Sequence, residues 1–214
     1  DITPLAVVLI KDKLRENVNN TINYFKEQGV ALKVISGDSV KTVQNIAKDT
    51  GITGAENAID MTTVKTQEEL EKAAENCSVF GRVTPQQKKQ LVIALKKNGH
   101  SVAMTGDGVN DVLALKEADC SIAMAAGSDA ARNVSQLVLV NNDFASMPGV
   151  VAEGRRTINN LERSSALYIV KTIYTIILSV FFIFFHMPYP FEPIHFSLVG
   201  ALTVGLPSFV LALQ

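Results

Sequence analysis

Short apolar runs alternate with longer amphipathic stretches over the first 149 residues. We expect the apolar runs to form strands at 5–10, 31–36, 78–81, 101–106, 120–125 and 137–140. We expect the amphipathic stretches to form helices at 15–29, 39–51, 67–75, 84–99, 111–119 and 128–135. Strands that alternate with helices pair in parallel, so this pattern predicts an α/β fold with a doubly wound parallel sheet. Ligands of such sheets bind beyond the carboxyl ends of the strands.

Capping residues support two of these helices in particular. Ser39 can cap the start of one helix, and Gly51 can end it. Pro85 lies in the first turn of another helix, which Gly99 can end. Residues 53–76 are mostly polar, so the helix at 67–75 is the only element that we predict there.

From residue 166 onward the alternation gives way to continuous apolar sequence. Residues 166–185 contain one charged side chain, Lys171, and residues 194–213 contain none unless His195 is protonated. Each segment is long enough to cross a bilayer as a helix. The alternative is a buried helical hairpin of a larger soluble protein. We favour membrane helices because "IILSVFFIFF" is apolar on every helical face.

Basic residues lie on one side of the first apolar segment. Arg155, Arg156 and Arg163 precede it, whereas the loop that joins the two segments has no Lys or Arg. The positive-inside rule then predicts that the soluble part lies in the cytoplasm and the joining loop outside. We expect a multi-pass protein of the plasma membrane. The expected parts are a soluble domain at 1–149, a stalk helix at 150–165, and membrane helices at 166–187 and 194–213.

The composition narrows the classes of partner. The 214 residues are 47% hydrophobic and carry a formal net charge of -1. This length can bury a sizeable core, and a near-neutral chain without a basic tract is not expected to bind nucleic acid. Cys77 and Cys120 match no metal-ligand spacing, so we interpret them as small core residues. Because the chain begins without Met, we expect a piece of a longer protein.

Polar residues and glycines follow two of the predicted strands. The first set is Ser36, Gly37 and Asp38, and the second is Asp107, Asn110 and Asp111 within "TGDGVND". Donors beside glycine suit phosphate oxygens, and carboxylates suit Mg²⁺. We expect Asp107 and Asp111 to repel one another and a divalent cation to relieve that repulsion. Turn and capping chemistry is the alternative, which stays open for the first set.

Lys88 lies in the first turns of the helix predicted at 84–99. A fixed ammonium near a phosphate would offset the charge that develops during phosphoryl transfer. The alternative is a solvated helix face that Lys88 shares with Lys89. We therefore single out Lys88 only because it accompanies the two polar sets.

The motif "TGDGVND" follows an apolar strand, with "RVTPQQK" before it and "ALKEADCSIAM" after it. Together these motifs resemble the phosphorylation domain of P-type (E1–E2) cation-transporting ATPases. The resemblance extends from "IKDKLRENVNN" to "VGLPS", nearly the whole chain. It implies a haloacid dehalogenase-like fold, an aspartyl-phosphate intermediate, and ATP and Mg²⁺ as substrate and cofactor. The chain would be the C-terminal part of that domain plus the fifth and sixth membrane helices of the family.

The same resemblance implies a role for each motif residue. Asp107 would coordinate Mg²⁺, Asn110 and Asp111 would shape that site, and Lys88 would contact the phosphoryl group. The phosphate- and nucleotide-binding residues would be Ser36, Gly37, Asp38, Asp12, Arg15 and Arg82. The expected partners are ATP, the transported cation, the lipid bilayer and the missing N-terminal part of the same pump.

One departure concerns the phosphorylated aspartate. The family carries it in "DKTGT", which this chain lacks, so we expect the isolated chain to be inactive. Asp12 in "DKLRE" lacks the Thr-Gly-Thr that would close on phosphate. A membrane-anchored phosphatase with Asp12 as nucleophile is nevertheless an alternative. A sensor or binding module without turnover is a third hypothesis.

A second departure concerns the ion. Calcium pumps of the family bind it with carboxylates and amides in these two helices. The matching positions here include Thr172, Thr175 and Thr203, so the resemblance predicts a cation without identifying it. Lys171 shares a helix face with Thr175 and Ser179 and is a candidate for the transport path. The alternative is that Lys171 extends its ammonium to the membrane surface.

Overall fold

The computed structural model describes residues 17–186, 188–189 and 191–212. It divides into two compact units, with the boundary between Pro148 and Gly149. The strand expected at 5–10 and the nucleotide-site candidates Asp12 and Arg15 lie outside the described residues.

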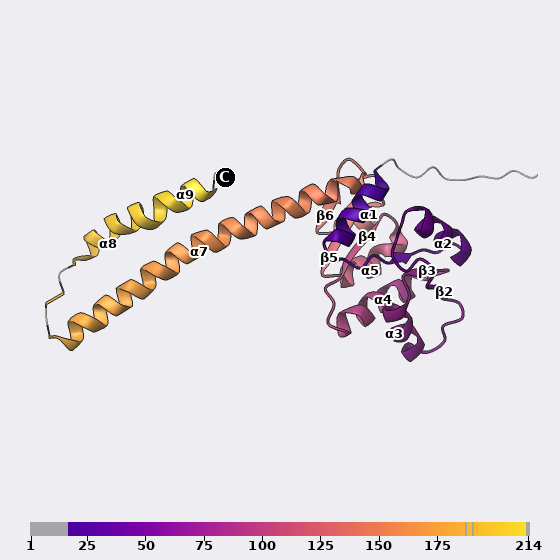
Figure 1. The fold of residues 1–214 in the computed structure, drawn as a ribbon, viewed down its shortest axis with the longest axis horizontal. Helices are drawn as coiled ribbons and strands as arrows, with labels where there is room; N and C mark the ends of the chain where they lie inside the picture. Colours follow the sequence, from indigo (N-terminus) through magenta and orange to yellow (C-terminus); the bar gives the residue numbers. More distant parts are fainter. Residues whose placement is uncertain (1–16, 187, 190, 213–214) are drawn as a thin grey trace, which may run out of the picture. The chain divides into compact units, whose positions relative to one another are not determined.

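Parallel strands form two sheets in the first unit (Figure 1). One has the order β1 (Val34–Ile35), β3 (Val79–Gly81), β2 (Ala58–Asp60). The other has the order β4 (Ala103–Gly106), β5 (Cys120–Met124), β6 (Leu137–Leu139). The predicted parallel α/β class is therefore confirmed, although its strands lie in two sheets. We missed β2 because its three residues lie inside a polar stretch.

Helices join these strands, close to the predicted positions. They are α1 (Val18–Glu27), α2 (Val40–Asp49), α3 (Gln67–Asn76), α4 (Pro85–Lys97), α5 (Val112–Glu117) and α6 (Asp129–Val134). Short 3₁₀ turns, η1 (Val109–Asp111) and η2 (Phe144–Ser146), precede α5 and the next long helix. The predicted caps are present. Ser39 accepts a hydrogen bond from the Thr42 backbone, and Thr84 and Gln87 form a capping box.

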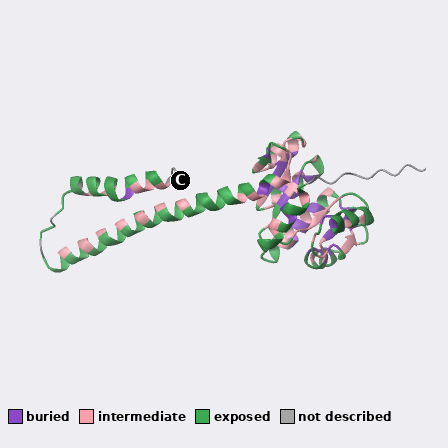
Figure 2. Ribbon diagram, turned by 45° about the horizontal axis from the view of Figure 1, so that its top comes forward, coloured by how far each residue is buried: buried purple, intermediate pink, exposed green. Residues whose placement is uncertain are grey.

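Helix α4 belongs to two of the four hydrophobic clusters in the described part of the first unit. Its Leu91 packs with Phe80 and Met61 beneath the first sheet, whereas the adjacent Val92 packs with Leu115 beside the second. Figure 2 shows that most buried residues lie in this unit. The two core contacts fix the position of α4, and Lys88 lies one helical turn before Val92.

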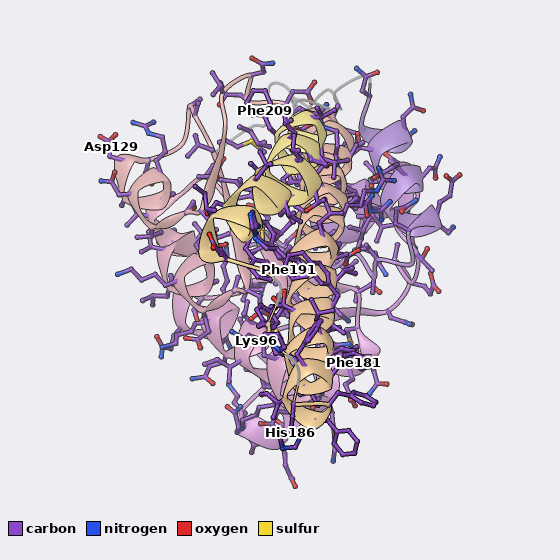
Figure 3. All side chains as sticks on the ribbon, turned by 90° about the vertical axis from the view of Figure 1, so that its left-hand side faces the viewer. Lys96, Asp129, Phe181, His186, Phe191 and Phe209 are labelled. Carbon is purple, nitrogen blue, oxygen red and sulfur yellow. The ribbon has the colours of Figure 1, made fainter. Side chains whose placement is uncertain are left out.

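The second unit contains nearly all of one long helix, α7 (Met147–Phe184), and α8 (Pro193–Gly200) and α9 (Leu206–Ala212) run back beside it (Figure 1). By length and composition, 144–184 and 194–211 are candidate membrane spans. Their apolar side chains are largely exposed, and Figure 3 shows Phe181 projecting outward from α7. The expected stalk and first span form a single helix, which ends at Phe184.

A π-helical segment, η3 (Ala201–Gly205), joins α8 to α9. Gly205, Leu206 and Pro207 are a sequence that can interrupt a helix, but here the backbone widens by one residue instead. The Leu206 N–H donates to the Ala201 carbonyl, five residues earlier. Pro207 is compatible with this widening, because in a regular α-helix its ring would meet the carbonyl four residues before it, here that of Thr203.

Candidate active site

An open cavity of about 340 Å³ lies at the carboxyl ends of β1 and β4. Ser36 directly follows β1, Asp107 directly follows β4, and Lys88 comes from α4. The full lining is Ile35, Ser36, Lys88, Met104, Thr105, Gly106, Asp107, Asp111 and Met124. The structure thus brings together four of the predicted site residues from separate parts of the chain. Strand residue Thr105 was missed, although its spacing of two from Asp107 places both on one face of β4.

Lys88 and Asp111 form a buried ion pair beside this cavity. The Lys88 ammonium lies 2.7 Å from Asp111 Oδ1, and each side chain is 11% exposed. The second Asp111 oxygen accepts hydrogen bonds from the backbone N–H groups of Asp107 and Gly108, at 3.3 and 3.2 Å. A Cβ on Gly106 would lie 2.5 Å from Asp111 Cβ, so the glycine makes room for the carboxylate. Asp111 therefore shapes the loop that carries Asp107.

This pairing corrects one expectation. We expected a divalent cation to relieve repulsion between Asp107 and Asp111. The Lys88 ammonium already balances the charge of Asp111, so relief of that repulsion is no argument for a metal.

Asp107 itself is exposed at the cavity wall. Within the described residues, no hydrogen bond or ion pair engages its carboxylate, and no group of three His, Cys, Asp or Glu side chains could hold a metal. One free carboxylate fits Mg²⁺, which proteins commonly bind through one or two carboxylates plus substrate phosphates and water. It does not fit a cation that needs a cage of protein ligands.

The turn after β1 is closed by its own side chains. Ser36 Oγ donates to Asp38 Oδ2 at 3.0 Å and accepts from the Asp38 backbone N–H at 3.2 Å. Ser36 lines the cavity, whereas Gly37 and Asp38 do not. Asn110 is exposed in η1 and also lies outside the lining. Of these four predicted site residues, only Ser36 therefore lines the cavity.

Arg82 adopts a left-handed backbone, with φ of 52°. Its N–H donates to the Asp38 carbonyl at 2.8 Å, and its guanidinium lies 3.6 Å from Asp60 Oδ2. The pKa of Asp60 is lowered, chiefly by hydrogen bonds from Thr62 and further by the Arg82 charge. Arg82 does not line the cavity. We could not foresee Asp60 as its partner because β2 was not predicted.

In the second unit, Lys171 and Thr175 lie on the partly buried face of α7. The Lys171 ammonium is so close to Gly200 that a Cβ there would lie 2.5 Å away. Lys171 and Thr203 line a mostly apolar cavity of about 190 Å³ between α7 and η3.

Each of the three predicted threonines uses its hydroxyl proton in a hydrogen bond to the carbonyl four residues before it. Thr172, Thr175 and Thr203 donate to the carbonyls of Tyr168, Lys171 and Val199. Their hydroxyl oxygens keep lone pairs that can accept or coordinate. Thr172 is exposed and lies outside the cavity, so it is the weakest transport candidate of the three.

Comparison with known proteins defines the class. Residues 1–119 match the haloacid dehalogenase-like hydrolases, and the chain belongs to this family. Over its full length the chain is homologous to P-type cation-transporting ATPases, which confirms the resemblance seen in the sequence. The fold agrees with a crystal structure of a zinc-transporting PIB-type ATPase in the E2.Pi state. The TM-score is 0.65 at 21% identity, over 80% of this chain and 24% of that one.

Two curated relatives are particularly similar. The chain is 44% identical to the calcium-transporting ATPase CtpE of Mycolicibacterium smegmatis, over 99% of this chain and 28% of the relative. It is 43% identical to the probable cation-transporting ATPase exp7 of Streptococcus pneumoniae, over 100% of this chain and 28% of the relative. The chain therefore spans little more than a quarter of the length of these relatives.

Proposed function

We propose that this chain is part of an ATP-driven cation pump that works through an aspartyl-phosphate intermediate. It supplies the Mg²⁺-binding and phosphate-contacting residues and two helices of the ion path. The observation that carries this proposal is the convergence of Ser36, Lys88 and Asp107 on one cavity at the carboxyl ends of two parallel strands. Such ends are where ligands of α/β folds bind.

The position of the cavity also suggests where the phosphorylated aspartate enters. In the described part of the chain, β1 pairs only with β3, and β4 pairs only with β5. The cavity lies between the free edges of β1 and β4, lined by Ile35 on one side and Met104 on the other. A further parallel strand would fit this gap and join the two sheets. We assign it to the rest of the pump and not to the strand expected at 5–10, because this chain lacks the "DKTGT" motif. Its carboxyl end would then lie between Ser36 and Asp107.

The residues present then have distinct roles. Ser36 Oγ can donate to a phosphate oxygen if it turns away from Asp38 Oδ2, and the Lys88 ammonium offsets negative charge on the transferring group. Asp111 fixes both the ammonium and the loop of Asp107. Asp107 would hold Mg²⁺, which neutralises phosphate charge when bound. Water then hydrolyses the aspartyl phosphate.

We further propose that the second unit spans the plasma membrane, with the first unit in the cytoplasm. The two helices contain no Asp, Glu or Asn over 166–187 and 194–213, so they offer no carboxylate for an ion. CtpE is named for calcium, but this chain supports only the wider assignment to a cation. Ser208 Oγ is buried without a hydrogen-bond partner in the described residues. A cation or another membrane helix would satisfy it.

The test is Mg²⁺-dependent phosphoenzyme formation by the full-length protein. Asp107→Asn removes a metal carboxylate, and a loss of about 4 kcal/mol of transition-state stabilisation would slow phosphorylation on the order of a thousandfold. Asp129→Asn is the control, because Asp129 lies outside the cavity and its side chain is 85% exposed. A wild-type rate of phosphoenzyme formation in Asp107→Asn at saturating ATP would contradict the assignment of Asp107 as a Mg²⁺ ligand.

The phosphatase alternative predicts a different result. With Asp12 as nucleophile, the isolated chain would hydrolyse a simple phosphate ester, and Asp12→Asn would abolish that activity. No described geometry favours this alternative, because Asp12 lies outside the described residues.

A further inference from the structure

The backbone of Asp107 is held from two sides. Its N–H donates to Asp111 Oδ2, as described above, and its carbonyl accepts a hydrogen bond from the Ser128 N–H at 2.7 Å. Ser128 also caps α6, because its Oγ accepts from the Ala131 N–H. A turn at 125–128, far along the chain from Asp107, therefore buttresses the loop of the proposed metal ligand.

Gly127 allows this turn to approach so closely. A Cβ at this position would lie 2.7 Å from the Asp107 backbone oxygen and 3.0 Å from Asp107 Cα. The backbone of Gly127 does not have a positive φ. Glycine is therefore required here for space and not for backbone conformation.

Arg132 forms hydrogen bonds with the backbone of the same turn. Its Nη1 donates to the carbonyls of Ala125 and Gly127, at 2.5 and 2.7 Å. Its Nη2 pairs with Asp129, whose side chain is 85% exposed and points outward in Figure 3. The guanidinium side chain is 35% exposed, so it lies between the turn and solvent.

We propose that Arg132 is a positioning residue for Asp107. By joining the Ala125 and Gly127 carbonyls, it holds the turn at 125–128 against the Asp107 backbone and keeps the carboxylate at the cavity wall. This inference rests on the proposed role of Asp107 as a Mg²⁺ ligand. Residues that orient a metal ligand typically change metal affinity 10- to 100-fold when they are removed.

The structure predicts which variants matter. Arg132→Ala removes both carbonyl contacts, whereas Arg132→Lys keeps a cationic donor on a stem of similar length. Asp129→Asn removes only the exposed partner of the guanidinium. Arg156 makes a similar i,i+3 pair with Glu153 on the surface of α7, so Arg156→Ala is a matched control.

The experiment measures full-length protein in two ways. The first is the Mg²⁺ midpoint of phosphoenzyme formation beside the ATP midpoint, and the second is amide hydrogen exchange at 107–111 and 125–128. Arg132→Ala should raise the Mg²⁺ midpoint roughly tenfold, leave the ATP midpoint unchanged, and accelerate exchange in both segments. Arg132→Lys should have a Mg²⁺ midpoint and amide exchange rates closer to those of the wild type than to those of Arg132→Ala. Asp129→Asn and Arg156→Ala should match the wild type in both measurements.

A wild-type Mg²⁺ midpoint and wild-type exchange in Arg132→Ala would overturn the inference. If Arg132→Ala does not accumulate as folded protein, the same two measurements are made on Arg132→Gln. Its amide is too short to reach both carbonyls, so an unchanged midpoint there would overturn the inference equally. If Asp107→Asn abolishes phosphorylation while both Arg132 variants behave as wild type, only this inference fails. If Asp107→Asn is also unaffected, the proposed function fails with it.

Discussion

Lys88 and Asp111 form a buried ion pair that supports the fold, and the proposed function gives the same two residues a chemical role. Their 2.7 Å contact is almost fully buried, and the loop of Asp107 is bonded to the same carboxylate. Removing one partner of a buried pair is costly because it leaves an uncompensated charge. The adjacent Lys89 offers a direct comparison, because its contact with Glu117 is longer, at 3.6 Å, and about a third exposed.

We therefore expect Lys88→Met to lower the free energy of unfolding by about 3 kcal/mol, since Asp111 is left charged and unpaired. Lys89→Met should change it by less than about 1 kcal/mol. Denaturant unfolding of the purified chain in detergent measures both values. Equal effects of the two substitutions would contradict the buried pair.

Asp119 gives the clearest pH dependence. Its carboxylate accepts hydrogen bonds from the Val102 N–H at 2.9 Å and pairs with Lys96 at 3.0 Å. The Val102 bond chiefly, and Lys96 next, lower the pKa of Asp119. A carboxyl with a lowered folded pKa adds stability above its unfolded pKa of about 3.9, and this stability is lost as pH falls through the folded value.

Asp119→Asn should therefore lower the melting temperature at pH 7. Near pH 2 the Asp119 carboxyl is protonated in both the folded and the unfolded protein, and the substitution should then have no effect. Glu162→Gln, an exposed charge change on α7, controls for net charge. Thermal unfolding between pH 2 and 7 measures the difference. A destabilisation that is constant across this range would show that the lost contacts do not depend on ionisation.

Some residues that line the cavity could be predicted from the sequence. Ser36 and Asp107 directly follow apolar runs that were expected to be strands. Lys88 was selected because it occurs together with these two polar sets. Gly127 could not be predicted, because it packs against Asp107, about twenty residues earlier in the chain, and Arg132 acts only on the turn that contains Gly127. No local pattern encodes which turn will pack beneath a given loop.

At the scale of elements, capping chemistry located the helices well and tertiary contacts decided the rest. Thr84, Pro85 and Gln87 specify the start of α4 from sequence alone. The two residues of β1 and the three of β2 are extended because they pair with β3. The π-helical form of η3 was not predictable from "GLP", which fits a break equally well.

Helix α7 and segment η3 give a test of the proposed ion path. If the Lys171 ammonium beside Gly200 is a fixed charge in that path, Lys171→Ala should preserve ATP turnover but change its dependence on the transported cation. Thr172→Ala is the matched control, because Thr172 is exposed on another face of α7. The measurement is ATPase activity of full-length protein in vesicles across a panel of monovalent and divalent cations.

The membrane-surface alternative for Lys171 predicts the opposite. Arg and Gln can both extend toward the interface, so Lys171→Arg and Lys171→Gln would then be nearly silent. Unchanged cation profiles in Lys171→Ala and Thr175→Ala would remove both residues from the ion path. The ligands would then come from the carbonyls of η3 or from other helices.

At the scale of the whole molecule, the two three-stranded sheets and the cavity between β1 and β4 indicate a site completed by another strand. The sequence predicted the parallel α/β class. It could not predict that the gap would open beside Ser36 and Asp107, because strand order depends on pairing between distant segments. The central claim is therefore that the nucleophile lies outside these 214 residues.

Locating the phosphoryl group tests that claim most directly. Full-length protein is incubated with γ-labelled ATP and Mg²⁺, quenched in acid and fragmented, and the labelled peptide is sequenced. We predict label on an aspartate outside this segment, in a "DKTGT" motif, and no label on the isolated 214-residue chain. Label on Asp12 that disappears in Asp12→Asn would contradict the account.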